Sequence, residues 1–387
     1  MRPLTPDLQA LAQAARKGGR LAMDTEFVGE GRYRTLLCLI QLAVSDGAGE
    51  ERIELLDPLQ EELDATPLAR VLADPDVAVV VHAGRQDVAL VKRYLGTEVR
   101  TVFDTQVAAG FVGMPAQASY DTLLTQVLGI RVAKSASFTR WDARPLSAEQ
   151  LAYAREDVVH LLELASELEA RLARLGRLQW AREECEPLQD ADDERDLERV
   201  FARLPRARSL SDSSQMVARE LVRWREQLAQ RQDRPVQSVL SDAALVEIAK
   251  RKPTSTGRLE QIRGVNPGSL RARGQDLLEA VRRGRERPPL TIAPPERPPA
   301  PDPDDAPLIA LAEALVRSRA REAELAYELL ATKADLQAIV AAARDGAQAD
   351  VRTLRGWRRE LVGDELLELL DGKISLSARD GKLRVLP

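Results

Sequence analysis

The sequence predicts a mixed α/β domain followed by two small all-helical domains. Residues 1–175 alternate short apolar runs with stretches of helical spacing, which is typical of a mixed sheet flanked by helices. Residues 209–287 and 308–387 show helical spacing almost throughout. A connecting helix and acidic linker occupy residues 176–208, and a proline-rich linker spans residues 288–307. These two connections divide the chain into three domains.

Each element of the first domain has its own signal. Apolar, strand-forming residues predict strands at 20–27, 35–44, 52–56 and 77–81. Helical spacing predicts helices at 65–73, 84–95, 105–111 and 120–128. A long helix is predicted from Ser147 to Leu175, because Ser147 and Gln150 form a capping-box pattern. In the last domain, Asp380-Gly381 predicts the turn of a small hairpin.

Composition is that of a soluble globular protein. The chain is 44% hydrophobic and 30% charged, and it contains no apolar run of about 18 residues, so we expect no membrane span. The first 20 residues lack the apolar segment of a signal peptide. Cys38 lies inside an apolar run and is expected to be a buried free thiol. We therefore expect a cytoplasmic protein.

Charge is unevenly distributed along the chain. Residues 1–205 contain 24 Lys and Arg against 34 Asp and Glu, whereas residues 206–287 contain 18 against 10. A basic domain behind an acidic one suggests a polyanionic partner. Chance segregation of surface charge is the alternative.

Two carboxylates lie on the first predicted strand. Asp24 and Glu26 are two residues apart, so both side chains leave the same face of the sheet. Such a pair costs stability through repulsion unless a cation lies between its members. Two solvated acids on an exposed strand are the alternative interpretation.

Three further residues complete the pattern. Asp87 follows the buried strand at 77–81 and lies in the first turn of the next helix, near the strand end where ligands gather in open sheets. Tyr153 and Asp157 are four residues apart and share one helix face. His82, at the start of the turn before Asp87, is a candidate for binding substrate. Each of these signals has a structural interpretation when taken alone.

Their joint order points to phosphodiester hydrolysis. Carboxylate oxygens are the ligands that Mg²⁺ and Mn²⁺ prefer. Two such ions can neutralise a pentacovalent phosphate and generate hydroxide near neutral pH. The sequence therefore predicts a site for two divalent metal ions (Mg²⁺ or Mn²⁺) held by Asp24, Glu26, Asp87 and Asp157.

The motifs resemble those of the ribonuclease D family. The segment 23–28 (MDTEFV), together with 39–42 (LIQL), is similar to the first exonuclease motif of that family, and 82–87 (HAGRQD) is similar to the second. Residues 153–157 (YARED) resemble the third motif in its tyrosine-bearing form. Residues 222–226, 262–265 and 354–363 resemble the helical domains shared by RecQ-type helicases and ribonuclease D (HRDC domains). The resemblance covers nearly the whole chain.

The resemblance implies a ribonuclease H-like fold and removal of nucleotides from RNA 3′ ends. It implies that the four carboxylates are metal ligands, that Tyr153 positions the attacking water, and that Thr25, Phe27 and His82 contact the terminal nucleotide. One departure is Arg140, in Thr139-Arg140-Trp141, where the family commonly has Asp. Residues 134–141 are expected to form a mobile loop near the site.

We expect a monomeric 3′–5′ exoribonuclease that releases 5′-mononucleotides and acts on structured RNA with short 3′ tails, such as tRNA precursors. A DNA exonuclease of the same superfamily and a non-catalytic RNA-binding scaffold are the alternatives. Phosphate contacts would supply sequence-independent affinity. The candidates for these contacts lie in the basic domain and are Arg223, Arg225, Lys250, Arg251, Lys252, Arg263 and Arg271.

Overall fold

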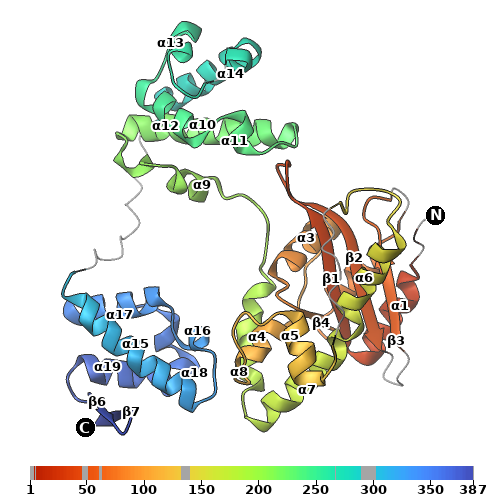
Figure 1. The fold of residues 1–387 in the computed structure, drawn as a ribbon. Helices are drawn as coiled ribbons and strands as arrows, with labels where there is room; N and C mark the ends of the chain where they lie inside the picture. The colour runs from red at the N-terminus through yellow and green to blue at the C-terminus, as the bar shows by residue number, and fades with distance from the viewer. Residues whose placement is uncertain are drawn as a thin grey trace.

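The computed structural model in Figure 1 describes residue 4 and residues 6–45, 51–60, 63–131, 140–265, 267–288 and 302–386. The N-terminal domain is built on a sheet with the strand order β3-β2-β1-β4-β5. Strand β1 pairs antiparallel with β2 and parallel with β4. The predicted mixed sheet is therefore confirmed. The strand bounds are Arg20–Val28 (β1), Leu36–Ser45 (β2), Glu51–Leu56 (β3), Ala78–Val81 (β4) and Val102–Asp104 (β5).

Helices cover both faces of this sheet. Side chains alternate between the two faces along each strand, so neighbouring residues of β1 pack against different helices. Leu21 and Met23 of β1 pack with α1 (Leu8–Gly18), α2 (Thr66–Leu72) and α3 (Arg85–Leu95). Ala22 points the other way and packs with α4 (Thr105–Gly110) and α7 (Leu161–Arg174). Helix α6 (Ala148–Val159) packs on this second face, against β1, β2 and β3. The second face carries Asp24 and Glu26.

The structure departs from the predicted elements in three places. Helix α1 was not predicted. Strand β5 was not predicted, because three residues are too few to show a period. The predicted helix from Ser147 to Leu175 is wrong as one element. It is divided at His160, whose φ of −105° and ψ of 3° end α6 and begin α7. Tyr153 and Asp157 both lie within α6, so their shared face survives the division.

Two helical modules follow α8 (Leu178–Cys185) and α9 (Leu197–Arg203). The first module begins with α10 (Asp212–Arg231), and the second with α15 (Asp305–Glu322). In both modules, the long helix is followed by a one-turn helix and then by a helix with a capped N-terminus. The capping residue is Ser241 in the first module and Thr332 in the second, and further helical segments follow. The remaining helices of the first are α11 (Val236–Val239), α12 (Asp242–Arg251), α13 (Thr256–Glu260) and α14 (Pro267–Glu286). Those of the second are α16 (Tyr327–Leu330), α17 (Lys333–Arg344), α18 (Gly356–Arg358) and α19 (Asp364–Leu370).

The chain ends in a hairpin of β6 (Ser375–Arg379) and β7 (Lys382–Leu386). Asp380 and Gly381 both have positive φ, as a two-residue hairpin turn requires, so the predicted hairpin is confirmed. Most of the proline-rich linker lies outside the described residues. No helix in the described part of the chain is long and apolar enough to cross a membrane.

Each helical module contacts the N-terminal domain at a separate place. The turn between β1 and β2 contacts the first module, where Arg32 pairs with Asp233 at 2.7 Å. The second module docks on α4 and α8, where the backbone N–H of Ala326 donates to the carbonyl of Gly110. Arg358 and Arg352 also pair with Glu184 of α8. The core of the second module is continuous with the core beside the sheet.

Candidate active site

Strand β1 presents the first two carboxylates. Its register with β2 is regular from Ala22 to Glu26, so Asp24 and Glu26 lie on one face, as their spacing predicts. The register shifts between Glu26 and Phe27. An irregularity of this kind bends the strand locally, and bulges are common next to active sites. Asp24 and Glu26 therefore lie just before the irregularity, and pairing continues in a shifted register at Phe27 and Val28.

The loop after β4 positions Asp87. The carboxylate of Asp104 accepts hydrogen bonds from the backbone N–H groups of Ala83 (3.0 Å) and Gly84 (2.9 Å). Only glycine fits at position 84, because a Cβ there would lie 2.4 Å from the Cβ of Val81. These contacts set the start of α3, and Asp87 follows in its first turn. The buried hydroxyl of Thr25 donates to Asp87 from β1.

Helix α6 presents Tyr153 and Asp157. Its N-terminus is held by the predicted capping box of Ser147 and Gln150. The ring of Tyr153 lies beside that of Trp141, with centroids 6.1 Å apart. The segment before the helix is tied to the sheet by Arg144, which donates twice to Asp57, at 2.6 Å each.

The four carboxylates interact electrostatically, which brings the three predicted motifs together. Burial raises the pKa of Asp24 well above its usual range, and the charges of Asp87, Asp157 and Glu26 add to this. Burial and the same neighbouring acids raise the pKa of Glu26 to about 8. Burial raises the pKa of Asp157 to about 7, with smaller contributions from Asp121 and Glu156. Ionising all four groups together is therefore unfavourable without a counter-charge.

This donor set fits divalent cations. All four groups supply oxygen ligands, which hard cations prefer. Oxygen Oδ2 of Asp157 is buried and has no hydrogen-bond partner, so it is available to a ligand. Among the described residues, however, no three acidic, histidine or cysteine side chains lie close enough to hold an ion as they stand. The charges of Asp87 and Asp157 nevertheless act on Asp24 and Glu26, so the four groups share one site.

Two residues that sequence reasoning missed also belong to this site. The hydroxyl of Tyr120, at the start of α5 (Tyr120–Leu123), is buried without a hydrogen-bond partner. Burial and the charge of Asp157 raise its pKa. The amide of Gln41 is buried opposite Asp24. Gln41 could have been noticed in the sequence, because it is an amide in the middle of an apolar run. No sequence pattern singled out Tyr120.

The predicted nucleotide contacts have different surroundings. His82 Nδ1 lies 3.0 Å from the Thr105 hydroxyl, and its ring lies 5.6 Å from that of Tyr120. Burial lowers the pKa of His82. Phe27 is partly buried against the α1–α3 side of the sheet. The hydroxyl of Thr25 is buried against Asp87, so it supports a carboxylate, and its contact with the nucleotide stays a prediction.

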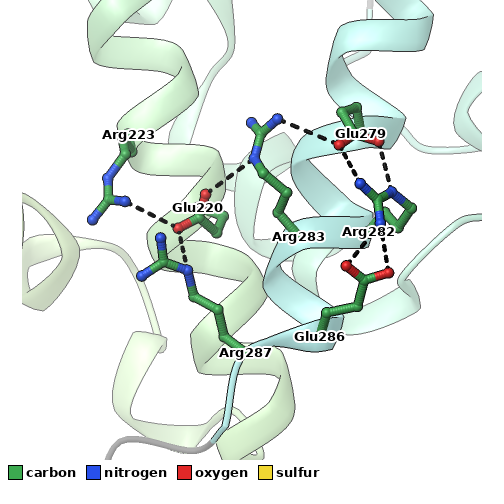
Figure 2. A network of polar contacts seen from close by, with 7 residues as sticks. All are labelled: Glu220, Arg223, Glu279, Arg282, Arg283, Glu286 and Arg287. Atoms are coloured by element: carbon green, nitrogen blue, oxygen red, sulfur yellow. Dashed lines mark hydrogen bonds and ion pairs between the residues drawn. The ribbon is translucent and has the colours of Figure 1, made fainter.

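The basic candidates of the first helical module also differ in their surroundings. Arg225 is 1% exposed and pairs with Asp242 at 2.6 Å, so it serves the fold and cannot reach RNA. Arg223 pairs with Glu220, which Arg283 and Arg287 also contact (Figure 2). Arg251 pairs with Glu247, and Lys252 donates to Ser213. Lys250 and Arg263 are exposed, and the side chain of Arg271 lies outside the described residues.

Residues 132–139 of the expected loop near the site also lie outside the described part of the chain. Arg140, which replaces the family's usual Asp, is exposed and pairs with Asp142 at 3.2 Å. Trp141 is buried against the sheet. The described end of the loop is therefore anchored, with Arg140 facing solvent.

The chain is similar to known exonucleases. Residues 5–173 match the 3′-5′ exonuclease family, and residues 214–281 match the HRDC domain. A ribonuclease D of Gluconacetobacter diazotrophicus is 36% identical over 99% of this chain and 95% of that protein. One of Zymomonas mobilis is 33% identical, over 98% of this chain and 97% of that protein. The crystal structure of Escherichia coli RNase D, described as an exoribonuclease involved in structured RNA processing, has a TM-score of 0.78. It is 28% identical and covers 95% of this chain and 98% of that chain.

The fold and the carboxylate site together define a 3′–5′ exonuclease of the metal-dependent superfamily. Within it, the chain belongs to the ribonuclease D family. Its activity is that of a 3′–5′ exoribonuclease. The predicted ribonuclease H-like domain followed by helical domains is confirmed.

Proposed function

We propose that Asp24, Glu26, Asp87 and Asp157 hold two divalent cations, Mg²⁺ or Mn²⁺, and that Tyr153 positions the attacking water. The charges of Asp87 and Asp157, which raise the pKa values of Asp24 and Glu26, carry this proposal. Bound divalent cations would supply positive charge to the phosphate and lower the pKa of water. Asp87 would be oriented by Thr25, and Asp157 would be presented by the same helix as Tyr153.

The phenol of Tyr153 would act as a hydrogen-bonding group and not as a phenolate. Burial, followed by the charges of Asp157, Glu26 and Asp24, raises its pKa, so it keeps its proton at neutral pH. In the reaction, the water oxygen forms a bond to phosphorus, and the bond from phosphorus to the 3′ oxygen of the preceding nucleotide breaks. That 3′ oxygen takes up a proton, and a 5′-mononucleotide is released.

We infer that the substrate is structured RNA with a short single-stranded 3′ tail, with tRNA precursors as the candidate. The E. coli relative is described as a processor of structured RNA, and the module that matches HRDC is basic. Phosphate contacts from this module would bind the RNA body without reading its sequence. The exposed candidates from the predicted set are Lys250, Arg263, Arg223 and Arg251, and Lys252 is half-buried. We further propose a monomeric, cytoplasmic enzyme.

One experiment tests the site. Purified protein and its Asp24→Asn variant are incubated with Mg²⁺ or Mn²⁺ and end-labelled RNA or DNA that carries a 3′ tail. We expect metal-dependent shortening of RNA from the 3′ end, release of 5′-mononucleotides, and a rate at least about 1000-fold lower for the variant. Activity retained in Asp24→Asn would contradict the ligand assignment. Faster digestion of DNA would contradict the substrate assignment.

A further inference from the structure

Gln41 is a fully buried amide directly beneath the carboxylate site. It lies in the middle of β2, and its exposed fraction is 0%. Neither its Nε2 nor its Oε1 has a hydrogen-bond partner. Burying an amide whose donors and acceptor are all unsatisfied destabilises a protein. A glutamine at this position therefore destabilises the folded chain.

The position of Gln41 on the sheet relates it to one carboxylate in particular. Gln41 is paired directly with Asp24 in the antiparallel β1–β2 ladder. Directly opposed side chains leave the same face, with Cβ atoms about 5 Å apart. The amide of a glutamine can therefore reach the carboxylate of Asp24. Leu39, Ala43 and the paired Leu55 are apolar neighbours of Gln41 on that face. Glu26, which is paired with Leu39, lies diagonally across from Gln41, so Asp24 is the carboxylate directly opposite it.

Unsatisfied buried atoms gather on this face of the sheet. Besides the two amide atoms of Gln41, the hydroxyl of Tyr120 and Oδ2 of Asp157 are buried without partners. Helix α6, which carries Asp157, packs on β1 and β2 over this face. Tyr120 is close enough for the charges of Asp157 and Asp24 to affect it. Four of the seven such atoms in the described part of the chain therefore lie around the carboxylate site, and the other three belong to Arg34, Arg93 and Arg225.

We propose that Gln41 is a positioning residue for Asp24: its amide N–H donates to the Asp24 carboxylate when that carboxylate turns to bind a divalent cation. A ligating carboxylate needs a partner for its other oxygen, and groups that orient metal ligands commonly change metal affinity 10- to 100-fold when they are removed. The carbonyl oxygen of the amide stays available to accept a hydrogen bond from water. This inference rests on the proposed role of Asp24 as a metal ligand.

The proposal makes an unusual prediction for Gln41→Met, which keeps a long unbranched side chain and removes the amide. We expect the metal-free variant to melt roughly 3 °C above wild type, because an unsatisfied buried polar group has been removed. We expect its affinity for Mn²⁺, measured by calorimetry without RNA, to fall about tenfold. The turnover number on RNA should fall while the KM changes little. If the amide of Gln41 only stabilised the fold, its removal would lower the melting temperature.

Leu55→Met is the matched control, since Leu55 is paired with Gln41 on β3 and is equally buried. It should keep wild-type Mn²⁺ affinity. An Mn²⁺ dissociation constant unchanged in Gln41→Met overturns the proposal, and so does failure of that variant to fold. Asp24→Asn separates this outcome from failure of the proposed function. If Asp24→Asn loses Mn²⁺ while Gln41→Met keeps it, only the role of Gln41 is wrong; if Asp24→Asn also keeps Mn²⁺, the ligand assignment itself fails.

Discussion

The indole rings of Trp180 and Trp357 stack with their centroids 4.9 Å apart and their planes inclined by only 11°. Trp180 belongs to α8, directly after the N-terminal domain, and Trp357 belongs to the last helical module. Phe111 packs edge-on against the same indole of Trp357, at 5.3 Å between centroids. Arg177 adds hydrogen bonds to the carbonyls of Phe111 and Ala323. This contact joins parts of the chain that lie far apart in the sequence.

Trp357→Ala is expected to release the last helical module from the N-terminal domain. Removing a buried tryptophan typically costs about 3 to 5 kcal/mol. Trp357 lies in the contact between the last module and the N-terminal domain, so its removal should weaken that contact. Limited proteolysis should then cut between the modules, and small-angle scattering should show a larger radius of gyration. Leu308→Ala, at an exposed position of α15, is the control and should change neither measurement. A compact, protease-resistant Trp357→Ala variant would show that the stack does not hold the module.

Tyr153→Phe is expected to lower the turnover number about 100-fold, since it removes the hydroxyl that would orient water. The ring and its contact with Trp141 remain, so the fold should be unchanged. Single-turnover kinetics on tailed RNA should show the loss in the chemical step, with KM and Mn²⁺ affinity within about twofold of wild type. Tyr94→Phe, at an exposed tyrosine of α3, should retain full activity. Equal losses of RNA affinity and rate would make Tyr153 a structural residue.

The metal-free protein is expected to lose stability as the pH rises from about 5 to about 8. Burial and neighbouring acids raise the pKa of Glu26 from 4.5 to about 8 and that of Asp157 from 3.8 to about 7. The folded state therefore binds protons that the unfolded state has already released, so stability is fully present below the unfolded pKa values and is lost as the pH passes the folded ones. Melting temperatures measured in a chelator across this range test the expectation.

Two comparisons make the pH experiment specific. Glu26→Gln should flatten the decline, because that side chain no longer titrates. Saturating Mn²⁺ should reverse it, since cation binding favours the ionised carboxylates. A melting temperature that is constant between pH 5 and pH 8 in the chelator would contradict the electrostatic account of the site.

Glu220→Gln is expected to destabilise the first helical module. Glu220 is 3% exposed and is contacted by Arg223, Arg283 and Arg287, at 3.3, 3.5 and 2.8 Å (Figure 2). Neutralising it leaves three half-exposed arginines without their shared carboxylate, and weakening the hydrogen bonds of this buried group costs about 1 to 3 kcal/mol. The denaturant midpoint of this module should fall.

A matched variant separates the buried network from its exposed neighbour. Glu286→Gln removes only an exposed partner of Arg282 in the same figure and should cost less than about 1 kcal/mol. Similar losses of stability in the two variants would show that burial of Glu220 is not what matters.

Local pattern was enough to predict most of the elements. The apolar runs of β1 to β4, the capping box at Ser147 and the Asp380-Gly381 turn each depend on residues close in sequence. The helix break at His160 was missed, because helical spacing continues across it and packing decides where the chain bends. The two helical modules share an order of elements but no clear sequence repeat, so the prediction that the last is a second HRDC copy remains a prediction.

The sequence alone determined which residue types form the site: Asp24 and Glu26 on one strand face, Asp87 after a buried strand, and Tyr153 with Asp157 on one helix face. Only the tertiary structure decided that Asp87 and Asp157 raise the pKa values of Asp24 and Glu26. It also decided that Thr25 supports Asp87 and that Arg225 is inside the fold. It also brought Gln41 opposite Asp24 and Trp357 onto Trp180. The physical reason is that periodicity sets the face a side chain occupies. Burial and neighbouring charge depend on which distant segments pack against that face.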